Sequence, residues 1–222
     1  MAAARTRQGD AQSEPRSRRD RDNIRELLLD AAIAEFGQNG FEAASTTSIA
    51  DRADAHQPQI NYHFSTKAEL WRAAVDRLFA VLNETLAGLA DLDPETRMIE
   101  IIRRTVRFAA ERPQLNQIML QESMVPSDRL VWLTETYVQG MYDALRDQWR
   151  HLREIGVAAP VDERLIYYVL IGSSSLPFAN QSEAAILIGP DHDSDELVEA
   201  HIDGLVAMLL PGRSTDAGGD TA

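Results

Sequence analysis

Residues 45–70 read STTSIADRADAHQPQINYHFSTKAEL, and this stretch decides the fold. Small and apolar residues at helical spacing predict two short helices within it. The first ends near Asp54–Ala55, and the second begins at Gln57 and ends at Tyr62 or His63. Two short helices joined by a tight turn are typical of a helix-turn-helix.

Hydroxyl side chains stand where the helices of this stretch begin. Thr46 or Thr47 can cap the first short helix, because a hydroxyl oxygen accepts the unpaired N–H groups of a first turn. Ser65 or Thr66 can cap a long helix over about 67–89 in the same way.

Helical periodicity extends to both sides of this stretch. Apolar residues recur every three or four positions from Ile24 to Phe36, which predicts a helix over about 20–38 ended by Gly37 and Gly40. No segment alternates as a strand would. The fold class is therefore all-α, with an N-terminal three-helix helix-turn-helix domain and a C-terminal helical bundle. Further helices are predicted at about 95–111, 114–123, 129–155, 161–181 and 194–210, with a loop over 182–193.

Composition divides the chain into four predicted parts. Polar, Arg-rich residues without apolar periodicity predict a disordered arm, and a Gly/Asp/Thr-rich end predicts a disordered tail. The parts are the arm at 1–19, a helix-turn-helix domain at 20–66, a larger helical body at 67–211 and the tail at 212–222.

The absence of cysteine excludes a disulfide framework and a thiolate metal site. No apolar run reaches the roughly 18 residues that a membrane-spanning helix needs. The N-terminus has no apolar core of a secretory signal. We expect a cytoplasmic protein.

The formal net charge of −13 argues against nucleic acid only at first sight. Residues 1–67 carry 9 basic and 10 acidic residues, whereas the remainder carries 13 and 25. The first 25 residues hold seven Arg and four acids. Binding to DNA needs local positive charge on one face and not a basic protein as a whole.

Several motifs in order give a specific resemblance. They are Ala31–Gly37 (AAIAEFG), Asn39-Gly40-Phe41, Thr46–Ala50 (TTSIA) and Ile60–Leu70 (INYHFSTKAEL). Together they resemble the DNA-binding domain of the TetR (tetracycline-repressor) family over roughly residues 22–71. The resemblance implies a three-helix DNA-binding domain with its third helix in the major groove. It also implies a long fourth helix coupled to a ligand-binding body whose last two helices pair with a second subunit.

The same resemblance assigns roles to individual residues. Threonines at the start of the second helix can hold a phosphate, and amides on the third helix can read base edges because they donate and accept together. Tyr62 is assigned to phosphate, whereas phosphate contact and packing both stay open for His63. The residues assigned to DNA are Thr46, Thr47, Gln57, Gln59, Asn61, Tyr62, His63 and Lys67.

One departure from the family pattern lies before the third helix. The family often has Gly-Val-Ser there, and this chain has Asp54-Ala55-His56, so that His56 replaces a Ser cap. Asp54 places an acid near the expected DNA face. The Arg-rich arm has two interpretations. It either reaches a groove, in which case affinity for DNA depends more on it, or it is solvated, as charge runs usually are.

The C-terminal part offers residues for a ligand cavity. Helical bundles bind ligands between their helices, and Met adapts to irregular apolar ligands. Most of the large apolar residues there are expected to be core, and small-molecule contact is predicted for a subset. That subset is Met119, Met124, Trp132, Tyr137, Met141, Tyr168 and Phe178.

Two other signals favour ordinary structural roles. Residues 191–196 (DHDSDE) suggest a metal site, but Asp193 or Ser194 as a helix cap explains them better, and no metal or cofactor is expected. Residues 172–176 (GSSSL) lack the second Gly and the preceding strand of a hydrolase nucleophile elbow. We expect no enzyme.

The sequence therefore predicts a ligand-responsive transcriptional regulator, a repressor released from a palindromic DNA operator by a small hydrophobic or aromatic effector. A homodimer through helices near 161–181 and 194–210 is expected, although the stripe Ile202, Leu205, Val206 and Leu209 can equally pack inside one subunit. A DNA-binding activator or architectural protein without an effector is the alternative. An enzyme with a convergent site in the body is a more remote one.

Overall fold

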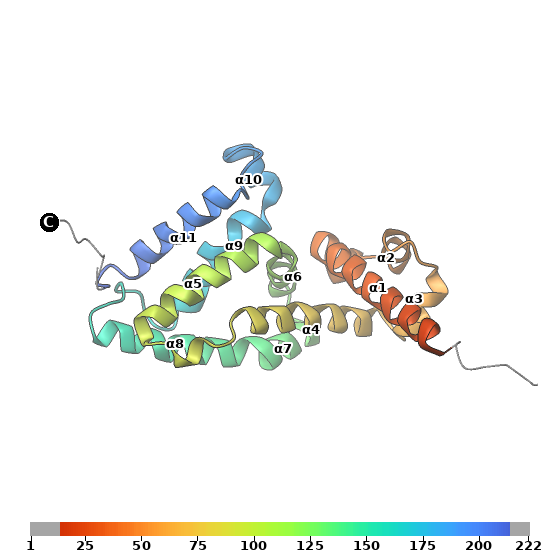
Figure 1. Ribbon diagram of the computed structural model, residues 1–222, viewed down its shortest axis with the longest axis horizontal. Helices are drawn as coiled ribbons and strands as arrows, with labels where there is room; N and C mark the ends of the chain where they lie inside the picture. The colour runs from red at the N-terminus through yellow and green to blue at the C-terminus, as the bar shows by residue number, and fades with distance from the viewer. Residues whose placement is uncertain (1–13, 214–222) are drawn as a thin grey trace, which may run out of the picture. The chain divides into compact units, whose positions relative to one another are not determined.

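In the computed structural model the described residues are 14–213, with side chains from residue 23 onward. Within this range the chain consists of helices joined by turns and loops (Figure 1), which confirms the predicted all-α class. The chain divides into two compact units between Ala74 and Val75. Residues 1–13 of the predicted arm and 214–222 of the predicted tail lie outside the described residues.

The first unit is built from α1 (Glu14–Ala43), α2 (Thr46–Arg52), α3 (Gln57–His63) and the start of α4 (Lys67–Thr85). The bounds of α3 match the prediction, and α4 ends four residues earlier than predicted. Residues 14–19 belong to α1 and not to a disordered arm. Their sequence lacks apolar periodicity, but Glu and Arg favour helices without it.

Gly40 ends the regular part of α1. Its φ of 67° lies in the left-handed region that only glycine adopts without strain, so the helix breaks there. Gly37, also predicted to end the helix, lies within it. The break turns Phe41 back onto the unit, where its ring stacks on Phe36 at 6.1 Å and meets Trp71 edge-on at 6.2 Å.

The first unit has a closed apolar core in which Phe36, Ile49, Ile60 and Trp71 are at most 1% exposed. Each of its four helices contributes to this core. Pro58 fits within α3 because it lies in the first turn, where its missing N–H breaks no helical hydrogen bond.

The second unit begins within α4 and continues with a short 3₁₀ turn, η1 (Leu89–Asp91). Its helices are α5 (Pro94–Glu111), α6 (Pro113–Ser123), α7 (Asp128–Leu133), α8 (Gln139–Glu154), α9 (Ile166–Ala179), α10 (Gln181–Leu187) and α11 (Asp195–Leu209). The predicted helix 129–155 is α7 and α8 joined by a π-helical turn, Thr134–Val138. The predicted loop 182–193 contains α10, which is too short and too polar at its start to stand out in the sequence.

The core of the second unit lies where α5, α8, α9 and α11 meet, around the fully buried Trp149. Ile202, Leu205, Val206 and Leu209 of α11 are all part of it, so this stripe packs inside the subunit and does not supply an interface. Gly212, assigned to a disordered tail, is held by its N–H to the Val157 carbonyl at 3.1 Å. None of the helices in residues 14–213 is long and apolar enough to cross a membrane.

Candidate DNA-binding face and ligand cavity

A buried carboxylate fixes α2 against α1. Glu35 of α1, 3% exposed, accepts the backbone N–H of Ser45 at 3.2 Å and the hydroxyl of Ser48 at 2.9 Å. Arg52 lies 3.6 Å away. Burial raises the pKa of the Glu35 carboxyl, but the hydrogen bonds and the Arg52 charge outweigh it, so the pKa is lower than usual. Glu35 is therefore a charged clasp within the helix-turn-helix.

The cap of α2 differs from the prediction. Ser45 accepts the N–H groups of Thr47 at 3.2 Å and Ser48 at 3.4 Å, whereas Thr46 and Thr47 are the first helical residues. Thr47 is exposed, and Thr46 is half-buried because its hydroxyl accepts from Gln57 Nε2 at 2.9 Å. Of the two threonines, Thr47 is the one presented to solvent.

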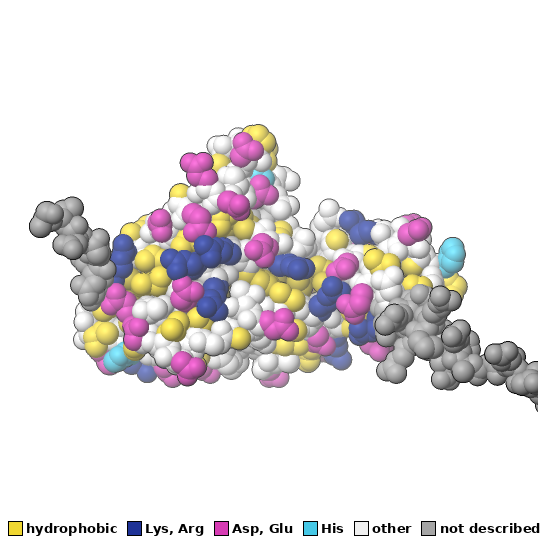
Figure 2. Space-filling view, in the orientation of Figure 1, with side chains coloured by type: hydrophobic (Ala, Val, Ile, Leu, Met, Phe, Trp, Pro, Cys, Tyr) yellow, Lys and Arg dark blue, Asp and Glu magenta, His cyan; other side chains and the backbone are white. Residues whose placement is uncertain are grey.

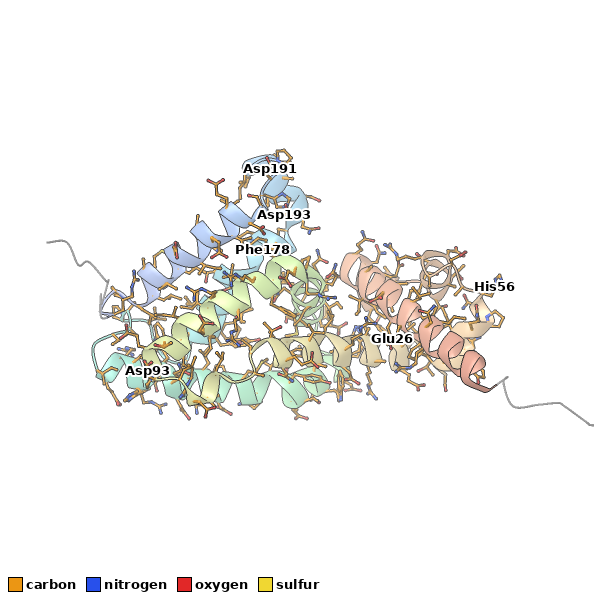
Figure 3. All side chains as sticks on the ribbon, in the orientation of Figure 1. Glu26, His56, Asp93, Phe178, Asp191 and Asp193 are labelled. Carbon is orange, nitrogen blue, oxygen red and sulfur yellow. The ribbon has the colours of Figure 1, made fainter. Side chains whose placement is uncertain are left out.

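Both glutamines of α3 contact the protein itself. Gln57 bonds to Thr46 across the turn, and Gln59 Oε1 accepts the backbone N–H of His56 at 2.7 Å. His56 occupies the cap position of α3, but Gln59 supplies the hydrogen bond there, and the exposed His56 side chain points outward (Figure 3). The glutamines set the start of α3 and its distance from α2.

The exposed end of α3 carries Asn61 and Tyr62. Tyr62 is 67% exposed, and its ring meets that of the half-buried His63 edge-on at 5.0 Å. Lys67, at the start of α4, donates from Nζ to the carbonyl of Glu42 at 3.1 Å and lies 4.8 Å from the Phe41 ring centre. A DNA phosphate would therefore have to compete with the Glu42 carbonyl for the Lys67 ammonium group.

The described side chains of the first unit, residues 23–74, include four basic and seven acidic residues. Asp54 stands in the turn before α3 with a φ of 50°, and it is exposed. A net acidic unit is a poor general binder of phosphate. Positive charge from beyond these residues would therefore strengthen contact with DNA.

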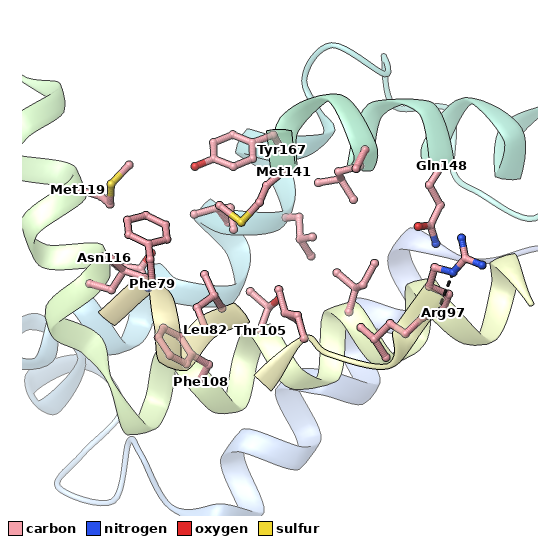
Figure 4. A pocket seen from close by; sticks show the side chains of 18 of the residues that line it. Phe79, Leu82, Arg97, Thr105, Phe108, Asn116, Met119, Met141, Gln148 and Tyr167 are labelled. Atoms are coloured by element: carbon pink, nitrogen blue, oxygen red, sulfur yellow. Dashed lines mark hydrogen bonds between the residues drawn. The ribbon is translucent and has the colours of Figure 1, made fainter. Parts of the chain in front are cut away.

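The second unit contains an apolar cavity of about 350 Å³ (Figure 4). Its walls come from α4, η1, α5, α6, α8 and α9, and every lining residue follows Val75. The lining includes Phe79, Leu82, Ile101, Thr105, Phe108, Leu115, Asn116, Met119, Met141, Leu145, Gln148, Tyr167 and Leu170, with Arg97. This volume lies at the lower end of the range of ligand sites in proteins.

Polar groups are few and lie apart within the cavity. Figure 4 shows Arg97 and Gln148 on one side, and Asn116 with Tyr167 on the other. Gln148 Nε2 donates to the Pro94 carbonyl at 3.2 Å. Burial, together with the neighbouring Tyr168, raises the pKa of Tyr167 to about 12, so this phenol is neutral at physiological pH.

Two of the seven residues predicted to contact the effector, Met119 and Met141, line the cavity. The others are absent from its lining. Met124 and Tyr168 are exposed, Phe178 is in the core, and Trp132 packs against Tyr137, which lies in the π-helical turn. Apolar size alone could not separate core from cavity. The polar lining residues Arg97, Thr105 and Gln148 were missed because their spacing on α5 and α8 resembles that of any solvated helix face.

Tyr137 links the π-helical turn to α4 at the cavity wall. Its ring stacks on that of Phe79, a lining residue, at 4.2 Å and 3°, and Trp132 meets it edge-on at 5.7 Å. Its hydroxyl donates to the carboxylate of Asp76. Burial, and then Asp76, raise the pKa of Tyr137. Tyr137 lies in the π-helical turn, a feature that often marks functional sites.

Other charged clusters are accounted for within the fold. Asp191 and Asp193 lie in the loop before α11 (Figure 3), where Ser194 is the N-cap residue and Asp195 and Glu196 open the helix. Basic side chains gather over α5 in Figure 2, but Arg103 and Arg104 pair with Glu100, and Arg107 pairs with Glu199. This basic group is neutralised and does not form a second DNA-binding surface.

The comparisons with known proteins agree with this arrangement. A model of the bacterial regulatory proteins of the tetR family matches residues 28–74. The HTH-type transcriptional repressor NicS of Pseudomonas putida is 27% identical over 105 residues, which are 46% of this chain and 50% of NicS. The residues that match the tetR-family model all lie in the first unit. The HTH-type transcriptional activator FasR of Mycolicibacterium smegmatis is 43% identical over 61 residues, 28% of each chain.

The fold of this chain is similar to that of AibR, solved in complex with isovaleryl coenzyme A and operator DNA. The two share a TM-score of 0.68 at 18% identity over 85% of this chain and 98% of AibR. The chain spans half the length of NicS and 28% of FasR. These relatives are named as transcriptional regulators and not as enzymes, in agreement with the sequence-based expectation.

Proposed function

We propose that this chain is a TetR-family DNA-binding regulator whose operator affinity is controlled by a small molecule in the cavity of the second unit. The observation that carries the proposal is α4, which begins beside the helix-turn-helix at Lys67 and contributes Phe79 and Leu82 to the cavity wall. AibR, which has a similar fold, was solved with both an acyl coenzyme A and operator DNA, and this supports the combination of the two sites.

Within the first unit, we assign the residues predicted to contact DNA to three groups. Asn61 is the proposed base reader, since it is exposed and its amide donates and accepts. Thr47, Tyr62, His63 and Lys67 are the proposed phosphate contacts. Gln57, Gln59 and Thr46 position α3, because their side chains bond to each other or to the α3 cap.

The proposed assembly is a homodimer through α9 and α11. Leu165, Tyr168, Val169 and Leu176 form an exposed apolar stripe at helical spacing along α9 and just before it. Gly172 within this stripe and Gly204 on α11 have open space where a Cβ would be, so a second helix can approach closely. A two-fold dimer would present two copies of α3 to a palindromic operator.

Ligand binding would then favour a body conformation that no longer fits both half-sites. Such coupling is typically about 1–3 kcal/mol and acts in both directions. We propose residues 20–66 for DNA binding and 67–211 for ligand binding and dimerisation, with repression as the direction of control and the cytoplasm as its location. FasR, which is similar over 61 residues, is named as an activator, so a reporter assay is needed to decide between repression and activation.

The deciding experiment measures binding of the full chain to fragments of its own promoter region. The wild type is compared with Asn61→Ala and with Asn83→Ala, an exposed asparagine of α4 in the second unit. We expect tight binding to one fragment, a loss of about 1–3 kcal/mol of discrimination in Asn61→Ala, and no change in Asn83→Ala. Equal affinity of the wild type for all fragments would overturn the proposal.

A further inference from the structure

One end of the cavity carries a guanidinium that is only partly satisfied. Arg97, near the start of α5, donates from Nε to the carbonyl of Leu89 at 3.0 Å. Its Nη2 donates to the carbonyls of Ala90 and Leu92, each at 2.7 Å. These contacts use three of the five N–H donors of the side chain. Within the described part of the chain, the two N–H groups of Nη1 have no hydrogen-bond partner.

Arg97 also has no carboxylate within ion-pair distance among the described residues. The other arginines of α5 with half-exposed or exposed side chains do: Arg103 and Arg104 pair with Glu100, and Arg107 with Glu199. Arg97 is instead the one charged side chain that the described residues contribute to a mostly apolar lining. A cation at an apolar wall without a counter-ion is unfavourable, so binding an anion there would be favoured.

We propose that the ligand of this cavity is a single-chain amphiphile whose anionic group binds the Nη1 edge of Arg97 and whose apolar chain lies toward Met119. The inference rests on the proposed function and deepens it. The backbone contacts of Arg97 hold its guanidinium in place, so the ligand would meet an ordered donor pair. Gln148, which lies beside Arg97 in Figure 4, is placed to contact the same group.

The length of the chain follows from the cavity volume. An engineered apolar cavity of about 150 Å³ accommodates benzene, which corresponds to about 25 Å³ per carbon atom. At that density, 350 Å³ holds roughly 14 non-hydrogen atoms. Dodecanoate has that size. Phe79, Met119 and Met141 line the part of the cavity away from Arg97, and the two methionines can adjust to the end of a chain.

The test is calorimetric titration of the purified full chain with three probes: dodecanoate, dodecanol and dodecanoyl coenzyme A. The variant is Arg97→Gln, which removes the charge but keeps a donor for the η1 carbonyls. The matched control is Arg104→Gln, because Arg104 also donates to two backbone carbonyls, those of Thr85 and Ala87 at 3.0 Å each, yet does not line the cavity.

We expect dodecanoate, dodecanoyl coenzyme A or both to bind the wild type and Arg104→Gln alike, and to bind Arg97→Gln about 10- to 100-fold more weakly. Arg97→Lys should recover part of the loss. Dodecanol should bind weakly and equally to all variants. The acid alone would identify a free carboxylate as the anionic group, and the thioester alone would identify the coenzyme A phosphates.

Equal binding by Arg97→Gln, dodecanol binding as tightly as the acid, or no binding of either anionic probe would overturn the ligand class. Operator binding by the ligand-free protein is measured in parallel. If the protein binds its operator specifically but the cavity binds none of the probes, the proposed regulator function stands and only the amphiphile ligand is rejected. If the protein does not bind any operator specifically, the proposed function itself is rejected.

Discussion

The hydroxyl of Tyr137 donates a hydrogen bond to the carboxylate of Asp76, joining the π-helical turn to α4 beside the cavity. The same ring stacks on Phe79, whose side chain lines that cavity. A ligand that displaces Phe79 would therefore disturb a contact to the helix that begins beside the helix-turn-helix. This relationship gives the proposed coupling a specific side chain to examine.

Tyr137→Phe removes this hydrogen bond and keeps the ring stack. Because Asp76 is exposed, we expect a loss of only about 1 kcal/mol of unfolding free energy, measured by urea denaturation. The pKa of Tyr137 is raised, so its contribution is complete below pH 10, the ordinary value, and is lost as the pH rises through the higher folded value. Tyr142→Phe, whose hydroxyl makes a longer 3.3 Å bond to the Arg164 carbonyl, should lose less. Equal losses would contradict the special role of Tyr137.

Glu35→Gln tests the clasp between α1 and α2. We expect it to lower the unfolding free energy by about 2 kcal/mol near pH 7, since a buried carboxylate loses charge-assisted hydrogen bonds. The folded pKa of Glu35 is below 4.5. The advantage of the wild type should thus be complete above pH 4.5 and disappear as the pH falls through the folded value. Asp51→Asn on the exposed face of α2 is the control, and an equal loss there would refute the clasp.

The sequence predicted the first unit better than the second. Short helices with flanking hydroxyls and Gly40 define the helix-turn-helix locally, so α3 begins at the predicted residue and ends at one of the two predicted ends, His63. The sequence does not indicate that Gln57 and Gln59 form hydrogen bonds within the protein. A glutamine on a polar helix face has the same sequence pattern whether it caps a helix or contacts a DNA base. In the second unit, the division between core and cavity depends on how α5, α8 and α9 meet, which periodicity on each helix does not determine.

Gly212 should tolerate no side chain. A Cβ there would lie 2.1 Å from the Gly156 carbonyl oxygen. Because the Cβ and this oxygen are both fixed to the backbone, the clash cannot be relieved by a side-chain rotation. We expect Gly212→Ala to lower the unfolding free energy by about 1–3 kcal/mol. Gly140→Ala in α8, with nothing within 4 Å of the added atom, should instead raise it by up to about 1 kcal/mol. Thermal unfolding of both variants tests this prediction. An unchanged unfolding temperature in Gly212→Ala would show that Gly212 does not pack closely against Gly156.

Leu176→Arg tests the proposed dimer. Leu176 is 48% exposed within the apolar stripe of α9, and a charge there should convert the dimer to a monomer in light scattering and weaken operator binding. Ile155→Arg is the matched control, since Ile155 is 54% exposed at the end of α8, outside the stripe. A wild type that is already monomeric, or a dimer that survives Leu176→Arg, would reject this interface.

The Arg-rich arm is tested by the salt dependence of DNA binding. The described side chains of residues 23–74 are net acidic, so phosphate neutralisation is expected to come from the arginines before them. If Arg5 and Arg7 each contact one phosphate, the double Ala variant should lower the slope of log affinity against log salt by about 1.8. The Arg112→Ala/Arg153→Ala variant removes equal charge from exposed positions of the second unit and should leave the slope nearly unchanged. Equal slopes in the wild type and the arm variant would mean that these arginines are solvated, and that Lys67 and the N–H groups of α2 carry the phosphate contacts instead.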